Sequence, residues 1–168
     1  MKNIIAILLV ALALSSGCSS QRGASPGQVH VSNGDFETGA VTPWASWLAV
    51  QPSVTSEKSH NGKFSLAELS DGNGSVYQDV SGLEPGAEYT VSAWTSGQPA
   101  TTAAAQIAVY DASANISTLS PAIVPTTEWQ VVKRRTNASS TGVIRVHLFH
   151  NQGNGPIFWD DVEVTRVQ

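Results

Sequence analysis

AEYTVSAWTS, residues 87–96, is the stretch that decides the fold of this chain. Tyr89, Val91 and Ala93 are apolar, and the positions between and after them hold Thr, Ser and Trp94. A period of two is typical of a β-strand with one face on a core and the other on solvent. The stretch therefore predicts a half-buried strand.

Similar runs recur along the chain between turn signals that contain Gly, Asn and Pro. The runs span residues 63–69, 75–80, 87–96, 104–112, 128–136, 142–150 and 157–164. Outside the N-terminal segment, no part of the sequence has apolar residues at helical spacing over roughly a dozen positions, so little helix is expected. About eight strands in one chain predict an all-β sandwich or barrel. Trp129, at the entry to one run, is expected in the core.

The beginning of the chain is predicted to be an export signal. Lys2 precedes an apolar run over residues 4–14, which is too short to span a bilayer as a helix. Cys18, the single cysteine, directly follows the small residues at 15–17, and this arrangement resembles the lipobox of bacterial lipoproteins. The resemblance implies lipidation of Cys18 and anchoring to the outer membrane or cell surface. Ser15 stands where a lipobox usually has Leu, and an ordinary secretory signal is the alternative.

Three parts follow from this layout. Residues 1–17 would be the signal, residues 18–28 the lipidated cysteine and a flexible tether, and residues 29–168 a single β-sandwich domain. The formal net charge is -4 and only 13% of residues are charged. These values argue against nucleic acid as a partner, because nucleic-acid binding usually needs a concentrated basic patch. They suit a neutral ligand, and any membrane contact would come through the lipid anchor alone.

Three of the predicted strands place aromatic side chains among hydrogen-bonding ones on the face away from the core. The candidates are Trp94, Tyr110, Gln106, Arg145 and His147. A sugar ring lies with its C–H face on an aromatic ring, and its hydroxyl groups need donors and acceptors such as amides, Arg and His. If the three strands share one sheet, these side chains form one open glycan-binding surface. The alternative is that each aromatic packs under a loop or against the second sheet.

IFWDDVEV, residues 157–164, places an acid where an apolar side chain is expected. Strict alternation puts Asp160 on the same face as Val162 and Val164. Because an unpaired buried charge is costly, a partner should lie beside Asp160.

Six successive blocks of the sequence carry a family resemblance. They are NGDFETG (33–39), a segment with Trp44 and Trp47, SHNGKFSL (59–66), VYQDVSGLEPGAEYTVSAW (76–94), TEWQVV (127–132) and FWDDVEV (158–164). Together they resemble CenC-like carbohydrate-binding modules of families 4, 9 and 22. The resemblance implies a jelly-roll β-sandwich of the galactose-binding-domain-like kind that binds a polysaccharide or oligosaccharide along a concave sheet. Such modules usually accompany a glycoside hydrolase, so a separate hydrolase is an expected partner.

The resemblance also implies a structural calcium ion between the first acidic block and the late DDV block. Glu37 and Asp160 match those positions, and Asp161 is the less certain partner because its parity faces the other way. Calcium takes several oxygen ligands, so backbone carbonyls would complete the site. The alternative is that Asp160 accepts backbone N–H bonds from the first loop and no metal binds. Glu68 departs from the family, which tends to have an apolar residue there, and this predicts a bulge or an altered strand end.

The predicted function is non-catalytic carbohydrate binding at the cell surface. A surface-anchored structural or adhesion protein that binds another protein is the alternative, and an accessory part of glycoside hydrolase activity is the third choice. Glu37 and Asp160 could be imagined as a glycosidase pair, but their expected place at the sandwich edge disfavours it. The sequence has no metalloprotease helix motif, nucleophile elbow or phosphate loop.

Overall fold

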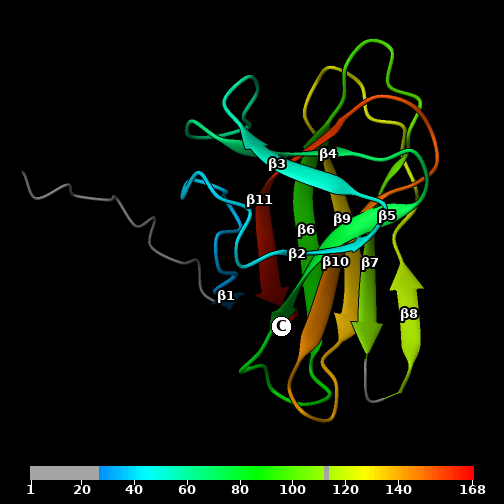
Figure 1. Cartoon of the computed structure of the whole chain (residues 1–168). Coiled ribbons are helices and arrows are strands. Elements are labelled where there is room, and N and C mark those ends of the chain that lie inside the picture. The colour runs from blue at the N-terminus through cyan, green and yellow to red at the C-terminus, as the bar shows by residue number, and fades with distance from the viewer. Residues whose placement is uncertain (1–26, 112–113) are drawn as a thin grey trace, which may run out of the picture.

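The alternating runs build two antiparallel sheets that pack face to face (Figure 1). The computed structural model describes residues 27–111 and 114–168, and every regular element in these ranges is a strand. The predicted β-sandwich is therefore confirmed. Cys18 and the predicted signal lie outside the described residues. Within the described ranges, no helix is long and apolar enough to cross a membrane.

Sheet A has the strand order β3-β4-β11-β6-β9, with β1 paired to β11. Its strands are β1 Gln28–Val29, β3 Gln51–Thr55, β4 Ser65–Leu69, β6 Glu88–Ser96, β9 Gln130–Asn137 and β11 Ile157–Arg166. Sheet B has the order β2-β5-β10-β7-β8. Its strands are β2 Ala45–Leu48, β5 Gly74–Val80, β7 Ala105–Asp111, β8 Ile116–Leu119 and β10 Ile144–His150.

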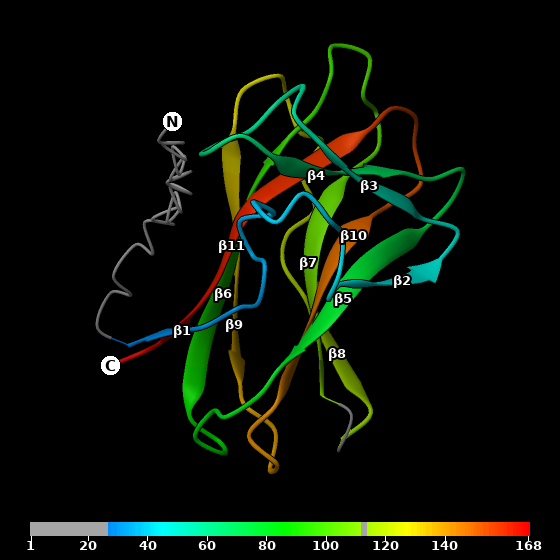
Figure 2. The same ribbon diagram turned by 60° about the vertical axis from the view of Figure 1, so that its left-hand side comes forward.

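The core lies between the sheets and is made of the apolar residues that alternate along each strand. Val91 of β6, Ile107 of β7, and Val146 and Leu148 of β10 are fully buried there. Consecutive strands lie in different sheets at every connection except β3–β4 and β7–β8. Near the two ends of the described chain, β1 runs beside the C-terminal part of β11 (Figure 2).

A bulge in β11 reverses the predicted orientation of the acidic residues. The register against β6 shifts after Asp160, and Asp161 has a φ of 45°. One extra residue in a strand moves all later side chains to the opposite face. Val162 and Val164 belong to the core, whereas Asp160 lies on the outer face of sheet A under a loop. The prediction that these three residues share a face is wrong for this reason.

Glu68 lies inside the sandwich in regular strand register, opposite Ile157 of β11 and Pro52 of β3. The predicted bulge or altered strand end at Glu68 is therefore wrong. Its carboxyl group is fully buried and accepts hydrogen bonds from Trp159 Nε1 at 2.8 Å and from the Val76 backbone N–H at 2.9 Å. Burial raises the pKa of Glu68 to about 8, although both hydrogen bonds act to lower it.

Candidate functional site

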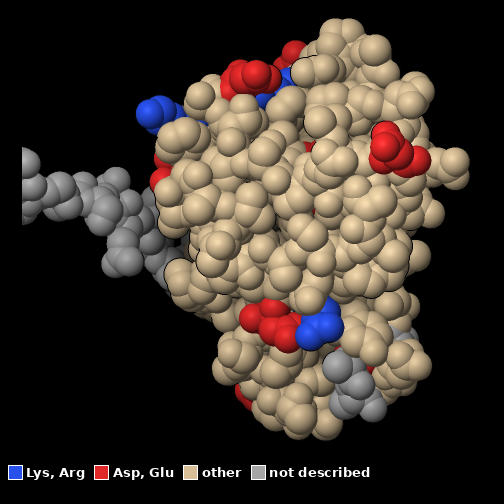
Figure 3. All heavy atoms as spheres, in the orientation of Figure 1, with Lys and Arg blue, Asp and Glu red and all other residues tan. Residues whose placement is uncertain are grey.

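The outer face of sheet B presents side chains in rows across neighbouring strands. Tyr77 of β5 pairs with His147 of β10, and Asp79 of β5 pairs with Arg145. Arg145 in turn pairs with Tyr110 of β7. Residues two apart along a strand point to the same face, so these side chains all stand on the side away from the core. Figure 3 shows this side of the molecule, on which Lys, Arg, Asp and Glu are sparse.

A continuous series of planar groups crosses this face, and we call it the aromatic strip. It consists of Trp47, Phe149, His147, Tyr77, Arg145 and Tyr110. The Trp47 ring lies 6.1 Å from His147 and 5.8 Å from Phe149. His147 stacks on Tyr77 at 5.2 Å and 28°. The strip draws on four of the strands of sheet B and ends at Trp47, which is 43% exposed on β2.

Arg145 connects the two tyrosines of the strip. Its guanidinium carbon lies 4.9 Å from the centre of the Tyr77 ring and 5.9 Å from that of Tyr110. Nε and Nη2 donate to the two oxygens of Asp79 at 2.6 and 2.8 Å. The hydrogen bonds lower the pKa of Asp79 and raise that of Arg145. Nη1 has no hydrogen bond to any described residue, so its N–H groups remain as donors toward a ligand.

His147 is held as a neutral ring in the middle of the strip. Burial, and then the positive charge of Arg145, lower its pKa to about 4. Its Nδ1 lies 2.8 Å from the Oγ of the fully buried Ser75. The neutral imidazole leaves Nε2 to donate to or accept from a hydroxyl group, depending on its tautomer.

Gln106 stands on the same face but is already engaged. Its Nε2 donates to the carbonyl of Ser120, and its Oε1 accepts from Asn151 Nδ2 at 3.4 Å. Tyr110 likewise donates from its hydroxyl group to Asn115 Oδ1 at 3.0 Å. Gln106 and Tyr110 are thus fixed in orientation by neighbouring loops, which favours a preformed surface.

Trp94 does not join the other four predicted residues. It lies on β6 in sheet A, whereas Gln106, Tyr110, Arg145 and His147 all lie in sheet B. The expectation that the three strands share a sheet is wrong, because the chain changes sheet between β6 and β7.

On sheet A, Trp94 packs under the loop of residues 57–64, as the alternative expectation had it. The His60 ring stacks on it at 4.0 Å and 15°. Trp129 meets the same His60 ring edge-on at 5.7 Å and is partly exposed. The prediction that Trp129 is a core residue is therefore also wrong.

Three further members of the strip, Trp47, Tyr77 and Phe149, were not among the predicted site residues. Tyr77 could have been found, because residues 75–80 alternate and Tyr77 falls on the polar face with Ser75 and Asp79. Phe149 shares the parity of Arg145 and His147. Trp47 lies on the four-residue strand β2, whose residues are all exposed and carry no alternation.

The acids predicted to bind calcium accept hydrogen bonds from the backbone of the loop of residues 57–64. Glu37 Oε1 accepts from the backbone N–H groups of Lys63 and Phe64, both at 2.8 Å. Asp160 Oδ2 accepts from the backbone N–H groups of His60 at 2.8 Å and Asn61 at 3.2 Å. Asp160 therefore accepts backbone N–H bonds, as the alternative expected, but the donors belong to the loop of residues 57–64 and not to the first loop.

Asp161 also binds this loop. Its Oδ2 lies 2.7 Å from His60 Nδ1 and 2.6 Å from Asn61 Nδ2. Burial raises the pKa of Asp160 to about 6, and the neighbouring Asp161 adds to the rise. A nearby cation would relieve this unfavourable concentration of negative charge.

The fit of these residues to calcium is partial. Glu37 Oε2 has no hydrogen bond to a described residue, and carboxylate oxygens are the donors that calcium prefers. Among the described residues, however, no three His, Cys, Asp or Glu side chains gather in a metal-binding group. Backbone carbonyl groups would have to supply most of the ligands.

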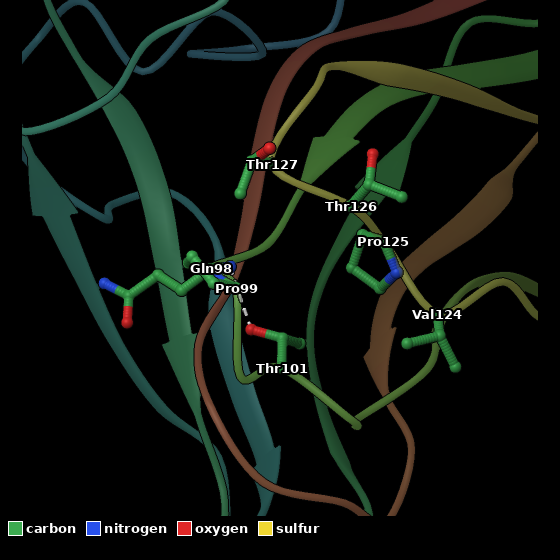
Figure 4. Close-up of a pocket in the computed structure, with 7 residues that line it drawn as sticks. All are labelled: Gln98, Pro99, Thr101, Val124, Pro125, Thr126 and Thr127. Atoms are coloured by element: carbon green, nitrogen blue, oxygen red, sulfur yellow. Dashed lines mark hydrogen bonds between the residues drawn. The ribbon is translucent and has the colours of Figure 1, made fainter.

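An open pocket lies at one end of the sandwich, away from the aromatic strip. Gln98, Pro99, Thr101, Val124, Pro125, Thr126 and Thr127 line it (Figure 4). The Gln98 backbone N–H donates to Thr101 Oγ1 at 2.9 Å and closes the turn on one side. The lining has no aromatic ring for a sugar and no charged group, so the strip is the stronger candidate site.

A β-sandwich whose open sheet face combines aromatic rings with hydrogen-bonding groups has the architecture of a carbohydrate-binding module. The family model described as "Carbohydrate binding domain", which covers families 4 and 9, matches residues 28–152. The chain belongs to this family, and the resemblance inferred from the sequence blocks is confirmed. No curated protein matches the chain significantly.

Solved structures of carbohydrate-binding modules share the fold. TmCBM61 in complex with β-1,4-galactotriose has a TM-score of 0.64 and 23% identity, over 83% of this chain and 99% of that one. The CBM22-1 xylan-binding domain of Paenibacillus barcinonensis Xyn10C has a TM-score of 0.65 and 16% identity, over 80% and 92% of the two chains. A family 16 module has a TM-score of 0.61 and 16% identity, over 79% and 96%.

Proposed function

We propose that this protein binds a neutral glycan chain, without catalysis, on the aromatic strip of sheet B. The continuity of the strip carries the proposal, since successive planar groups from Trp47 to Tyr110 lie 4.9 to 6.1 Å apart. A sugar ring would lie with its C–H face on Trp47, the exposed end of the strip, and the next rings would pass along the strip over the edge of Tyr77. Arg145 Nη1 and His147 Nε2 would hydrogen-bond the hydroxyl groups at the edge of each ring.

The charges on this face support a neutral ligand and a non-catalytic role. The positive charge of Arg145 is balanced by Asp79, and His147 is uncharged above about pH 5 because of its lowered pKa. Glycoside hydrolysis needs two carboxyl groups on opposite sides of the scissile bond. Asp79, the acid that hydrogen-bonds to the strip, is committed to Arg145.

We propose in addition that calcium binds beside Glu37 and Asp160 and stabilises the loop of residues 57–64. The unbonded Oε2 of Glu37 and the raised pKa of Asp160 support this role. When bound, the ion would offset the negative charge of the two acids that hydrogen-bond to the loop. The acids and the loop backbone are the groups of this chain that would hold it.

Lipidation of Cys18 and attachment to the bacterial envelope remain part of the proposal and rest on the N-terminal sequence. The first described strand, β1, pairs with β11 of sheet A. A tether that enters through β1 would therefore join the domain on the sheet opposite the strip. Such an anchor would make a weak binder effective by raising the local concentration of binding sites.

The test is retardation of the fragment 28–168, which contains both sheets, in native gels that hold plant, algal or microbial polysaccharides. Trp47→Ala and Tyr77→Ala are each expected to reduce binding roughly fivefold or more, since an aromatic contact contributes about 1 kcal/mol or more. Trp129→Ala is the matched control, because it removes a partly exposed aromatic ring that precedes β9 of sheet A and does not belong to the strip. No retardation of the folded wild-type fragment by any polysaccharide would refute glycan binding and favour a protein partner.

A further inference from the structure

Glu68 has a buried carboxyl group that makes no contact with the proposed glycan site. It is fully buried between the sheets, where an apolar side chain would avoid the cost of removing a carboxyl group from water. That cost appears as the rise of its pKa to about 8. We therefore ask which interactions the carboxyl group makes that an apolar side chain could not make.

The contacts of Glu68 link the two sheets. It projects from β4 of sheet A, and its Oε2 accepts from the indole N–H of Trp159 on β11, also in sheet A, at 2.8 Å. Its Oε1 accepts from the backbone N–H of Val76 on β5, in sheet B, at 2.9 Å. One carboxyl group thus accepts hydrogen bonds from a buried donor in each sheet.

Val76 occupies a sensitive position in β5. The residue before it, Ser75, contacts His147 Nδ1 at 2.8 Å, and the residue after it, Tyr77, stacks on both His147 and Arg145. A displacement of the Val76 backbone would therefore move Tyr77 of the strip together with Ser75, the hydrogen-bond partner of His147. Close-packed interiors transmit such displacements because they have few voids to absorb them.

The position of β5 in its sheet makes this support necessary. On one side β5 pairs with β10 over seven residues. On the other side its neighbour is β2, a strand of four residues that are all exposed and that includes Trp47. Support from β2 is weak, so the hydrogen bond from Val76 to Glu68 fixes β5 from the interior.

We propose that Glu68 is a positioning residue of the glycan-binding face: its carboxyl group, held by Trp159, fixes the Val76 amide and so places Ser75 and Tyr77 for the ligand. This inference rests on the proposed function. A binding site depends on the residues behind it, because a small loss of support loosens the geometry of every contact.

The test compares Glu68→Gln and Glu68→Met with Leu66→Val, another fully buried residue of β4 that makes no hydrogen bond to β5. Affinity for the retained polysaccharide, free energy of unfolding, and the ¹⁵N shifts of the His147 ring are measured for each. Glu68→Met removes both hydrogen bonds and is expected to weaken binding roughly fivefold or more and to change the His147 shifts, because the Val76 amide is no longer held. Leu66→Val is expected to lower stability while leaving affinity and the shifts unchanged.

The outcomes separate the two proposals. If the wild-type fragment binds no glycan, the proposed function fails, whereas the His147 shifts still report whether Glu68 positions β5. If the wild type binds and Glu68→Gln and Glu68→Met bind equally well with unchanged shifts, the positioning role is overturned. Equal weakening by Leu66→Val and the Glu68 variants would also overturn it, because Glu68 would then act through stability alone. If Glu68→Met does not fold, Glu68→Gln, which keeps one acceptor oxygen, decides between these results.

Discussion

Glu68→Gln is predicted to remove a large part of the pH dependence of stability at neutral and alkaline pH. The pKa of Glu68 rises from 4.5 to about 8 on folding because the group is buried. Between these values the folded protein keeps a proton that the unfolded chain has released. The contribution to stability is therefore fully present below pH 4.5 and is lost as the pH rises through 8.

The size of the effect follows from the shift. Each pH unit in this window costs about 1.4 kcal/mol, and the slope flattens near the folded pKa. Between about pH 6.5 and pH 9 the wild type should lose roughly 2 kcal/mol through Glu68 alone. The contribution of His147, which acts between its folded pKa of about 4 and its unfolded pKa of 6.5, ends where this window begins, and the Asp160 pKa of about 6 lies below it.

Urea unfolding followed by Trp fluorescence and circular dichroism gives the free energy of unfolding at each pH. The difference between Glu68→Gln and the wild type should shift in favour of the variant by roughly 2 kcal/mol from pH 6.5 to pH 9. The exposed acid Glu128→Gln controls for the loss of a carboxylate as such. A difference between Glu68→Gln and the wild type that stays constant over this range would refute the reasoning.

Three other predictions concern the loop and the strip. Calcium should raise the melting temperature of the wild type, and chelator should lower it. Asp160→Asn should abolish both responses. A wild type whose melting temperature changes with neither calcium nor chelator would contradict the calcium site. Glycan affinity should be constant from neutral pH down to about pH 5 and should weaken only as His147 protonates near its pKa of about 4. Affinity is measured by titration calorimetry at each pH. A fall in affinity with its midpoint near pH 6.5 would contradict a buried neutral ring. Arg145→Lys should weaken binding roughly tenfold, because an ammonium group can neither form the two-pronged bond with Asp79 nor lie flat between the tyrosines; unchanged affinity in the same assay would exclude Arg145 from the site.

The structure bears out much of what the strand periodicity predicted. Each of the seven alternating runs contains a strand, because a side-chain period of two is a local property that the sequence shows directly. The short strands β1, β2, β3 and β8 were not predicted, since they have two to five residues and little alternation. The order of the sequence blocks indicated the family, and the match over residues 28–152 confirms it.

Sheet membership limited the prediction of the binding face. The alternation placed Gln106, Tyr110, Arg145 and His147 on an outer face, and the structure brings these four together in sheet B. It could not show that Trp94 belongs to the other sheet. A strand looks the same in either sheet, and the pairing depends on contacts between residues far apart in the chain.

The sequence by itself determined that this chain is an all-β sandwich, which strands have a polar outer face, and which family it belongs to. These properties follow from side-chain alternation and local motifs. Only the tertiary structure decided that Trp47 completes the strip, that a bulge turns Asp160 outward, and that Glu68 links the sheets. The physical reason is that each of these depends on which distant strand lies opposite, and one added residue in a strand reverses every side chain after it.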